Sequence, residues 1–123
     1  IERKESTIKS VEIALKAAAV LDDRQAGDIV ILDVRENSSI TDYHVLATGT
    51  SGLHLRALID AVRQQMKAVG VPGYRVSGAY DSGWVVLDFV DAVVHVFSGE
   101  ARAYYDLESL WKDVPRVPFT PLE

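Results

Sequence analysis

The fold is decided by the sequence WVVLDFVDAVVHVF at residues 84–97. Two runs rich in β-branched and aromatic residues are separated only by Val90 and Asp91, which predicts an antiparallel β-hairpin. With these two residues as the turn, the strand pairs are Phe89–Ala92, Leu87–Val94 and Val85–Val96. Val90 is poorly suited to the positive φ of a type I′ turn, but a four-residue loop over 89–92 keeps the same pairing. A three-residue bulged loop would instead flip one strand.

Alternation along the two strands gives the hairpin two unlike faces. The first is wholly apolar and is expected in the core: Val85, Leu87, Phe89, Ala92, Val94 and Val96. The second mixes aromatic rings with a carboxylate and an imidazole, as a contact surface does: Trp84, Val86, Asp88, Val93, His95 and Phe97. Tryptophan is enriched among interface anchors, so Trp84 is the residue to single out, with a core position as the alternative.

The rest of the chain predicts one domain over residues 1–123, an α/β or α+β fold with a mixed four- to five-stranded sheet flanked by helices. Ser6 or Thr7 is expected to cap a first helix, whose inward positions would be Ile8, Val11, Leu15, Ala18 and Ala19. Further elements are expected as strands at 29–34, 43–48 and 74–76, a long helix after residue 52 that Gly70 and Pro72 stop, and a helix at 100–112. The proline-rich tail, 114–123, should be extended and weakly ordered.

The net charge of −5 lies entirely in one segment. Residues 1–80 carry ten acidic and ten basic residues, residues 81–113 carry seven acidic and two basic, and the tail carries one of each. An acidic field repels phosphate backbones and attracts basic proteins. We therefore expect a basic protein as partner and no direct nucleic-acid specificity; the alternative is a solvated acidic surface that aids solubility.

Composition also limits the chemistry. The absence of cysteine excludes disulfides, thiolate metal sites and a cysteine nucleophile, and it fits a reducing compartment. No apolar run approaches the roughly 20 residues of a membrane helix, and nothing resembles a signal peptide, so no membrane partner is expected. His44, His54 and His95 lack the spacing of a zinc site, so we expect no metal and no cofactor. His95 should form a hydrogen bond or face the partner; a satisfied, half-buried sheet position is the alternative.

Three motifs typical of enzymes bear on the chemistry of this chain: a phosphate loop, a DxD pair and a GxSxG elbow. GTSGLH at 49–54 lies between a strand and a helix, but it has neither the Walker lysine nor the GxGxxG spacing of a phosphate loop. A tight turn with Thr50 or Ser51 as helix cap is the preferred interpretation. The sequence also contains neither a DxD pair of carboxylates nor a GxSxG elbow. No catalytic residue is therefore predicted.

Several motifs, taken in order, resemble those of the ribosomal silencing factor family, RsfS, also called Iojap. They span about Asp28 to Trp111: SITDY at 39–43, TGTS at 48–51 with His54, WVVLD at 84–88, Asp91, VHVF at 94–97, Glu100, Arg102 and YDLESLW at 105–111. Two positions depart from the family pattern. Val90 stands where the family usually has glycine, and Leu53 stands where it commonly has arginine or lysine.

The resemblance implies a fold similar to nucleotidyltransferases without their catalytic carboxylates, and no enzymatic activity. It implies that the protein binds ribosomal protein fourteen of the large subunit and blocks joining of the small subunit, which represses translation when nutrients are scarce. A role in large-subunit assembly, a homodimer, and a cytoplasmic location in a bacterium or an organellar one in a eukaryote are also implied.

Residues and resemblance together predict one partner-binding surface: Trp84, Leu87, Asp88, Asp91, His95, Arg102 and Tyr105. Trp84 would be the apolar anchor, and Asp88 and Asp91 would pair with arginine or lysine. The remaining polar and aromatic members would frame the patch. Two alternatives stay open: a metal-dependent nucleotidyltransferase-like enzyme, which needs converging carboxylates, and a generic homodimerisation module that buries the same hairpin face.

Overall fold

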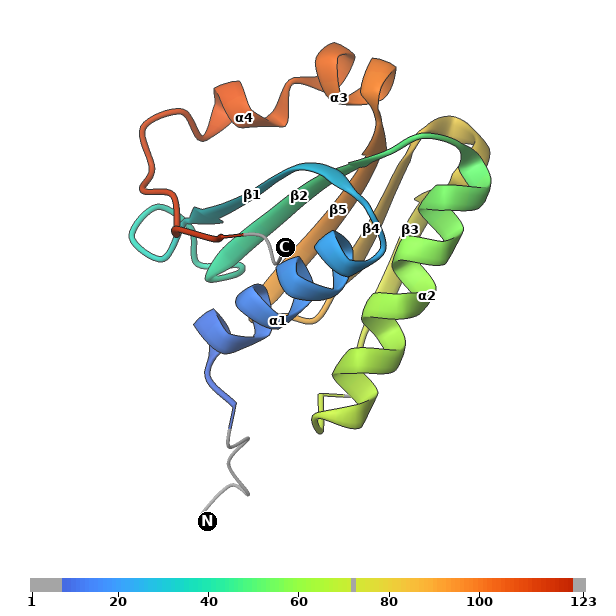
Figure 1. The fold of residues 1–123 in the computed structure, drawn as a ribbon. Helices are drawn as coiled ribbons and strands as arrows, with labels where there is room; N and C mark the ends of the chain where they lie inside the picture. The colour runs from blue at the N-terminus through green and yellow to red at the C-terminus, as the bar shows by residue number, and fades with distance from the viewer. Residues whose placement is uncertain (1–7, 72, 121–123) are drawn as a thin grey trace.

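A mixed five-stranded sheet forms the centre of the molecule, and α1 and α2 lie together against one of its faces (Figure 1). The computed structural model describes residues 8–71 and 73–120. In chain order the elements are α1 (Ser10–Asp23), β1 (Gly27–Asp33), β2 (Tyr43–Gly49), α2 (Gly52–Ala68), β3 (Arg75–Ala79), the 3-10 helix η1 (Tyr80–Ser82), β4 (Trp84–Asp88), β5 (Ala92–Ser98), α3 (Gly99–Tyr105) and α4 (Leu107–Leu110). None of the described helices has both the length and the apolar character that crossing a membrane would require.

The hairpin lies inside the sheet. The strand order is β1-β2-β5-β4-β3, with β2 and β5 parallel and the other neighbours antiparallel. β4 and β5 pair as predicted, with Leu87 opposite Val94 and Val85 opposite Val96. β5 is therefore the central strand, buried along residues 92–97, because its partners on both sides are other strands and helices cover both of its faces.

The first face of the sheet packs against α1 and α2 as predicted for the apolar side of the hairpin, but the buried stripe of α1 is not the predicted one. The residues of α1 that are buried are Ile13, Ala14, Ala17, Ala18 and Leu21. Of the predicted inward positions Ala18 is fully buried, while Ile8, Val11 and Leu15 are partly buried and pack against the same core. The helix is apolar on most sides, so periodicity alone does not choose the fully buried stripe. The predicted cap at Ser6 or Thr7 lies outside the described residues; α1 has Lys9 as its N-cap.

The second face of the sheet is more covered than the sequence predicted. A second core forms there from Leu32, Val34, Leu46, Phe97 and Ala101, with Trp84, Leu107, Trp111 and Val114 packed against it. Three of the six residues expected on a contact surface, Val93, His95 and Phe97, are buried as a result. The physical reason is that the chain after β5 folds back as α3 and α4 over this part of the sheet.

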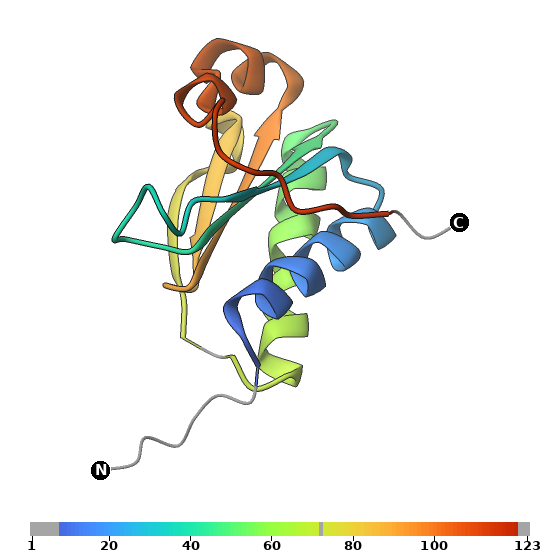
Figure 2. The same cartoon turned by 90° about the vertical axis from the view of Figure 1, so that its left-hand side faces the viewer.

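The C-terminal segment also departs from the prediction. Residues 100–112 form two short helices in place of one, because Asp106 adopts a left-handed φ of 47° between them. The tail is extended, as expected, but it pairs with β1: the Asp33 N–H donates to the Pro115 carbonyl over 2.8 Å, and the Val117 N–H donates to the Ile31 carbonyl over 2.9 Å. Figure 2 shows this segment, in red, crossing over β1 toward the α1 side.

The turn of the hairpin is strained at Val90. Its φ is 76°, and the Asp91 N–H donates to the Phe89 carbonyl over 2.9 Å, the features of a classic γ-turn. The Phe89 N–H donates to the Ala92 carbonyl, so the register predicted for a four-residue loop is kept. An L-residue with a Cβ, and a β-branched one above all, adopts this φ at a cost.

Replacing Val90 with glycine is expected to raise the free energy of unfolding by about 1 kcal/mol, since relief of the strain exceeds the entropy that glycine adds to the unfolded chain. Urea denaturation followed by circular dichroism measures the change. Val90→Ala keeps a Cβ at the same φ and should stabilise less. A glycine variant that is less stable than the parent would show that Val90 is not strained.

Candidate docking surface

Trp84 begins β4 and is half-buried on the second face of the sheet. Gly83, whose φ is 83°, precedes it and turns the chain from η1 into the strand. The indole packs against Phe97 with ring centroids 5.2 Å apart, and against Tyr105 at 4.6 Å. Tyr105 is half-exposed. Two predicted site residues therefore meet here, one from β4 and one from the end of α3.

The carboxylates predicted to bind a basic partner lie at the far end of β4 and in its turn. Asp88 is half-buried, and its Oδ1 accepts a hydrogen bond from the Val90 N–H over 2.7 Å. Asp91 is exposed, and its backbone carbonyl accepts from the Asp42 N–H, which holds the loop between β1 and β2 beside the turn. These acids and Trp84 lie along one strand and its turn, without a direct contact between them.

Three predicted site residues do not lie on this surface. Leu87 points to the opposite face and is fully buried in the first core. His95 is only 6% exposed and is hydrogen-bonded to the indole of Trp84, which is one of the two roles predicted for it. The side chain of Arg102 is 11% exposed and points into the protein. The structure thus places these three inside the protein, through the packing of the second face or of the first core, and their part in partner binding stays a prediction.

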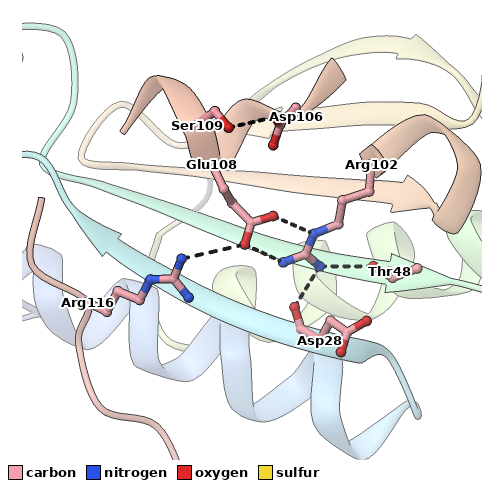
Figure 3. A network of polar contacts seen from close by, with 7 residues as sticks. All are labelled: Asp28, Thr48, Arg102, Asp106, Glu108, Ser109 and Arg116. Atoms are coloured by element: carbon pink, nitrogen blue, oxygen red, sulfur yellow. Dashed lines mark hydrogen bonds and ion pairs between the residues drawn. The ribbon is translucent and has the colours of Figure 1, made fainter. Parts of the chain in front are cut away.

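Arg102 joins the C-terminal helices to the sheet (Figure 3). Its guanidinium forms a two-point ion pair with Glu108 of α4, with distances of 3.1 and 3.2 Å. The same group donates to the carbonyl of Asp28 over 2.6 Å and to the hydroxyl of Thr48 over 2.9 Å. Asp28 lies in a bulge of β1, which leaves its carbonyl unpaired within the sheet. The Arg102–Glu108 pair therefore fixes α3 and α4 over β1 and β2.

A chain of hydrogen bonds runs beneath the surface from the indole of Trp84. The Trp84 Nε1–H donates to His95 Nδ1 over 3.2 Å, and His95 Nε2 lies 3.0 Å from His44 Nδ1. His44 packs in turn against Trp111, with ring centroids 5.6 Å apart. Burial lowers the pKa of His95 to about 3, with the neighbouring His44 acting in the same direction. Burial also lowers the pKa of His44, although the carboxylate of Asp88 opposes that shift.

The GTSGLH turn is closed by its own side chains, which fits the tight-turn interpretation. Ser51 is the N-cap of α2 and accepts a hydrogen bond from the His54 N–H over 3.0 Å. The Thr50 N–H donates to His54 Nδ1 over 2.9 Å. His54 Nε2 then lies 2.9 Å from the carbonyl of Arg24. Through these contacts the turn holds the start of α2 against the end of α1.

Residues missed by the sequence reasoning are two aliphatic side chains at the end of the sheet. Ile40 in the loop between β1 and β2 is 80% exposed, and Val90 in the turn is 68% exposed. Their loops touch through the hydrogen bond between Asp42 and Asp91. The signal was available for Ile40, an isolated aliphatic residue within the polar run 36–42. Single exposed apolar residues are common, however, so it was weak.

The described residues bring together no group of three or more histidine, aspartate or glutamate side chains that could hold a metal ion. A hollow of about 600 Å³ lies beside α3, lined among others by Arg102, Glu108 and Arg116. Its charged groups already bind one another, with Arg116 3.9 Å from Glu108. What the geometry offers is an exposed acidic and aromatic face, with no metal cluster among the described residues.

The fold is thus that of a small α/β protein, and its exposed acidic and aromatic face is a candidate docking surface. The family model described as "Ribosomal silencing factor during starvation" matches residues 7–123. The chain belongs to this ribosomal silencing factor family, RsfS.

Individual relatives agree with this assignment. The ribosomal silencing factor RsfS of Bacillus subtilis (strain 168) is 37% identical over 99 residues, which cover 80% of this chain and 84% of that protein. The Mus musculus protein named "Mitochondrial assembly of ribosomal large subunit protein 1" is 31% identical, over 76% of this chain and 42% of that protein. A crystal structure of a Chromobacterium violaceum protein is similar with a TM-score of 0.81 at 32% identity, and the match covers 94% of this chain and 95% of that one.

Proposed function

We propose that this chain binds a basic protein of the large ribosomal subunit, ribosomal protein fourteen, and keeps the small subunit from joining by occupying the space between them. The docking face would be the outer side of β4 with the turn between β4 and β5. The observation that carries the proposal is that the half-buried Trp84 begins the strand that Asp88 ends, with the exposed Asp91 in the turn that follows. Repression of translation follows from steric exclusion alone, without any chemical step.

Membership of the ribosomal silencing factor family supports an association with the ribosome. The name of the mouse relative supports a link to assembly of the large subunit in particular. Neither name specifies the ribosomal protein that is bound, so that part of the proposal rests on charge and on the resemblance.

Exposed acids of the segment 81–113 are available to a cationic partner, and Asp91 is the one in the turn of the hairpin; the others are Asp81, Glu100, Asp106 and Asp113. Of the acids in the segment 81–113, Glu108 is paired with Arg102, and Asp106 accepts a hydrogen bond from Ser109 over 2.5 Å. Asp91 is exposed in the turn beside the end of β4. Complementary charge at such a face mainly raises the association rate and is screened by salt.

Sedimentation with isolated ribosomal subunits tests the proposal. The chain is expected to pellet with large subunits and not with small ones, and the bound fraction should fall several-fold between about 50 and 300 mM monovalent salt because the contact is charge-assisted. Pre-binding should also reduce the yield of joined ribosomes when small subunits are added. Equal binding to both subunits, or binding unaffected by salt, would contradict the acidic docking face.

A homodimerisation module is the second candidate, favoured by one observation. β3 is the end strand of the sheet and is exposed along all five of its residues, so its outer edge could pair with a second copy. Light scattering over a range of concentrations, with and without large subunits, separates self-association from ribosome binding.

For the nucleotidyltransferase alternative, calorimetric titration with ATP and magnesium should give no heat of binding.

A further inference from the structure

The hydrogen-bond chain under the docking face has only one possible direction. The indole Nε1–H of Trp84 can donate and cannot accept, so His95 Nδ1 must be the acceptor. A neutral His95 then carries its proton on Nε2 and donates it to His44 Nδ1. His44 in turn carries its own proton on Nε2. One donor on β4 thus fixes the tautomers of two histidines on β5 and β2.

The hydrogen-bond chain of Trp84, His95 and His44 cannot accept an additional proton and stay intact. A second proton on His44 would occupy Nδ1 and face the Nε2–H of His95. If His95 then moved its proton to Nδ1, that proton would face the indole N–H at 3.2 Å. A second proton on His95 would occupy Nδ1 and face the N–H of the Trp84 indole directly. Any protonation therefore breaks one of the two hydrogen bonds. A charged His44 is the stronger donor, so its bond to His95 Nε2 is the one kept, and the bond to the indole of Trp84 is the one lost.

The surroundings decide which histidine titrates. His95 is enclosed, and burial strongly favours its neutral form. His44 is half-buried between His95 on β5, the ring of Trp111 after α4, and Leu32, its neighbour on β1. Asp88 on β4 is the carboxylate whose field favours a proton on His44, and Arg75 of β3 pairs with the backbone of Asp88. His44 is therefore the entry point for a proton.

We infer that His95 and His44 are positioning residues of the docking face: while both are neutral they hold the indole of Trp84 in a single orientation, and a proton on His44 releases it. The binding consequence rests on the proposed function. If docking requires His44 and His95 to be neutral, the dissociation constant for large subunits should rise about tenfold per pH unit below the pKa of His44. Burial places that pKa below its ordinary value of 6.5.

Nuclear magnetic resonance of the free protein tests the positioning itself. Long-range ¹H–¹⁵N spectra at pH 7.5 are expected to show His44 and His95 as Nε2–H tautomers, and the Trp84 indole N–H as a hydrogen-bonded proton. Lowering the pH to 5.0 should shift the Trp84 indole signal together with the His44 titration. An indole signal that stays fixed while His44 titrates, or an Nδ1–H tautomer of His95 at pH 7.5, would overturn the inference.

Variants carry the test to binding. In His44→Gln the amide oxygen can accept from His95 and cannot titrate, so large-subunit binding, whatever its strength at pH 7.5, should no longer change between pH 7.5 and 5.5. His54→Gln changes a histidine that is not part of the Trp84–His95–His44 hydrogen-bond chain, and this variant should keep the parent's pH profile of binding. A parental profile in His44→Gln would overturn the coupling. Absence of large-subunit binding at every pH would refute the proposed function, and the resonance measurements would then decide the positioning role independently.

Discussion

Replacing Arg102 with methionine is expected to lower the free energy of unfolding by about 3 kcal/mol, as removal of one partner from a largely buried ion pair does. Methionine keeps much of the side-chain volume but removes every donor of the guanidinium. The carboxylate of Glu108, only 26% exposed, then keeps Arg116 as its nearest cation at 3.9 Å. The carbonyl of Asp28 and the hydroxyl of Thr48 lose their donor at the same time.

Urea denaturation followed by tryptophan fluorescence suits this measurement, because Trp84 and Trp111 both belong to the second core. Adding Glu108→Gln to Arg102→Met should cost less than the sum of the single changes, since the second change removes the stranded charge. Arg24→Met is the matched control: it removes the same group from an exposed pair with Asp23 and should change stability by less than about 0.5 kcal/mol. An Arg102→Met variant as stable as this control would show that the pair does not hold α3 and α4 in place.

The sequence predicted the hairpin because its information is local. Alternation with period two fixes which residues of 84–97 share a face, and the two-residue gap fixes their partners. The predicted register of β4 and β5 is kept despite the strained φ of Val90, because the strand pairs outweigh the strain of one residue. The same local patterns predicted the second helix with Thr50 or Ser51 as its cap, and the structure has Ser51 there.

The second face was not predictable from such patterns. Arg102 and Glu108 lie six residues apart, across a break at Asp106, and so fall outside the i, i+4 spacing of a helical pair. The carbonyl of Asp28 is 74 positions from Arg102 and becomes available only because β1 bulges. Contacts of this kind depend on three-dimensional closure, and they convert half of an apparently open sheet face into core.

The candidate site shows the same division. Trp84, Asp88 and Asp91 were predicted from their residue types alone, and they lie on or beside the face of the sheet that is partly exposed. It placed His95 on that face without revealing its depth, because the parallel pairing that brings His44 within 3.0 Å joins strands 51 positions apart. Burial turns a residue chosen for contact into one that positions its neighbour.

Replacing Trp84 with alanine is expected to weaken binding to large ribosomal subunits by at least about 30-fold, the effect of removing a central aromatic anchor. An isolated surface anchor could be removed without cost to the fold. Trp84 is half-buried against Phe97 and Tyr105 and donates to His95, so the same change should also lower the free energy of unfolding by about 2 kcal/mol. Sedimentation should therefore be measured at low temperature, with circular dichroism showing that the variant is folded.

Two further variants separate anchoring from folding. Trp84→Phe keeps a ring against Phe97 and Tyr105 but lacks the indole N–H, so it should bind more tightly than Trp84→Ala and more weakly than the parent. Leu53→Ala truncates a side chain that is 80% exposed on α2, which packs against the opposite face of the sheet, and should leave binding unchanged. If folded Trp84→Ala binds large subunits within twofold of the parent, Trp84 is not the anchor. The docking face would then have to be sought at Ile40 and Val90, because these are the exposed aliphatic residues beside the same acidic turn.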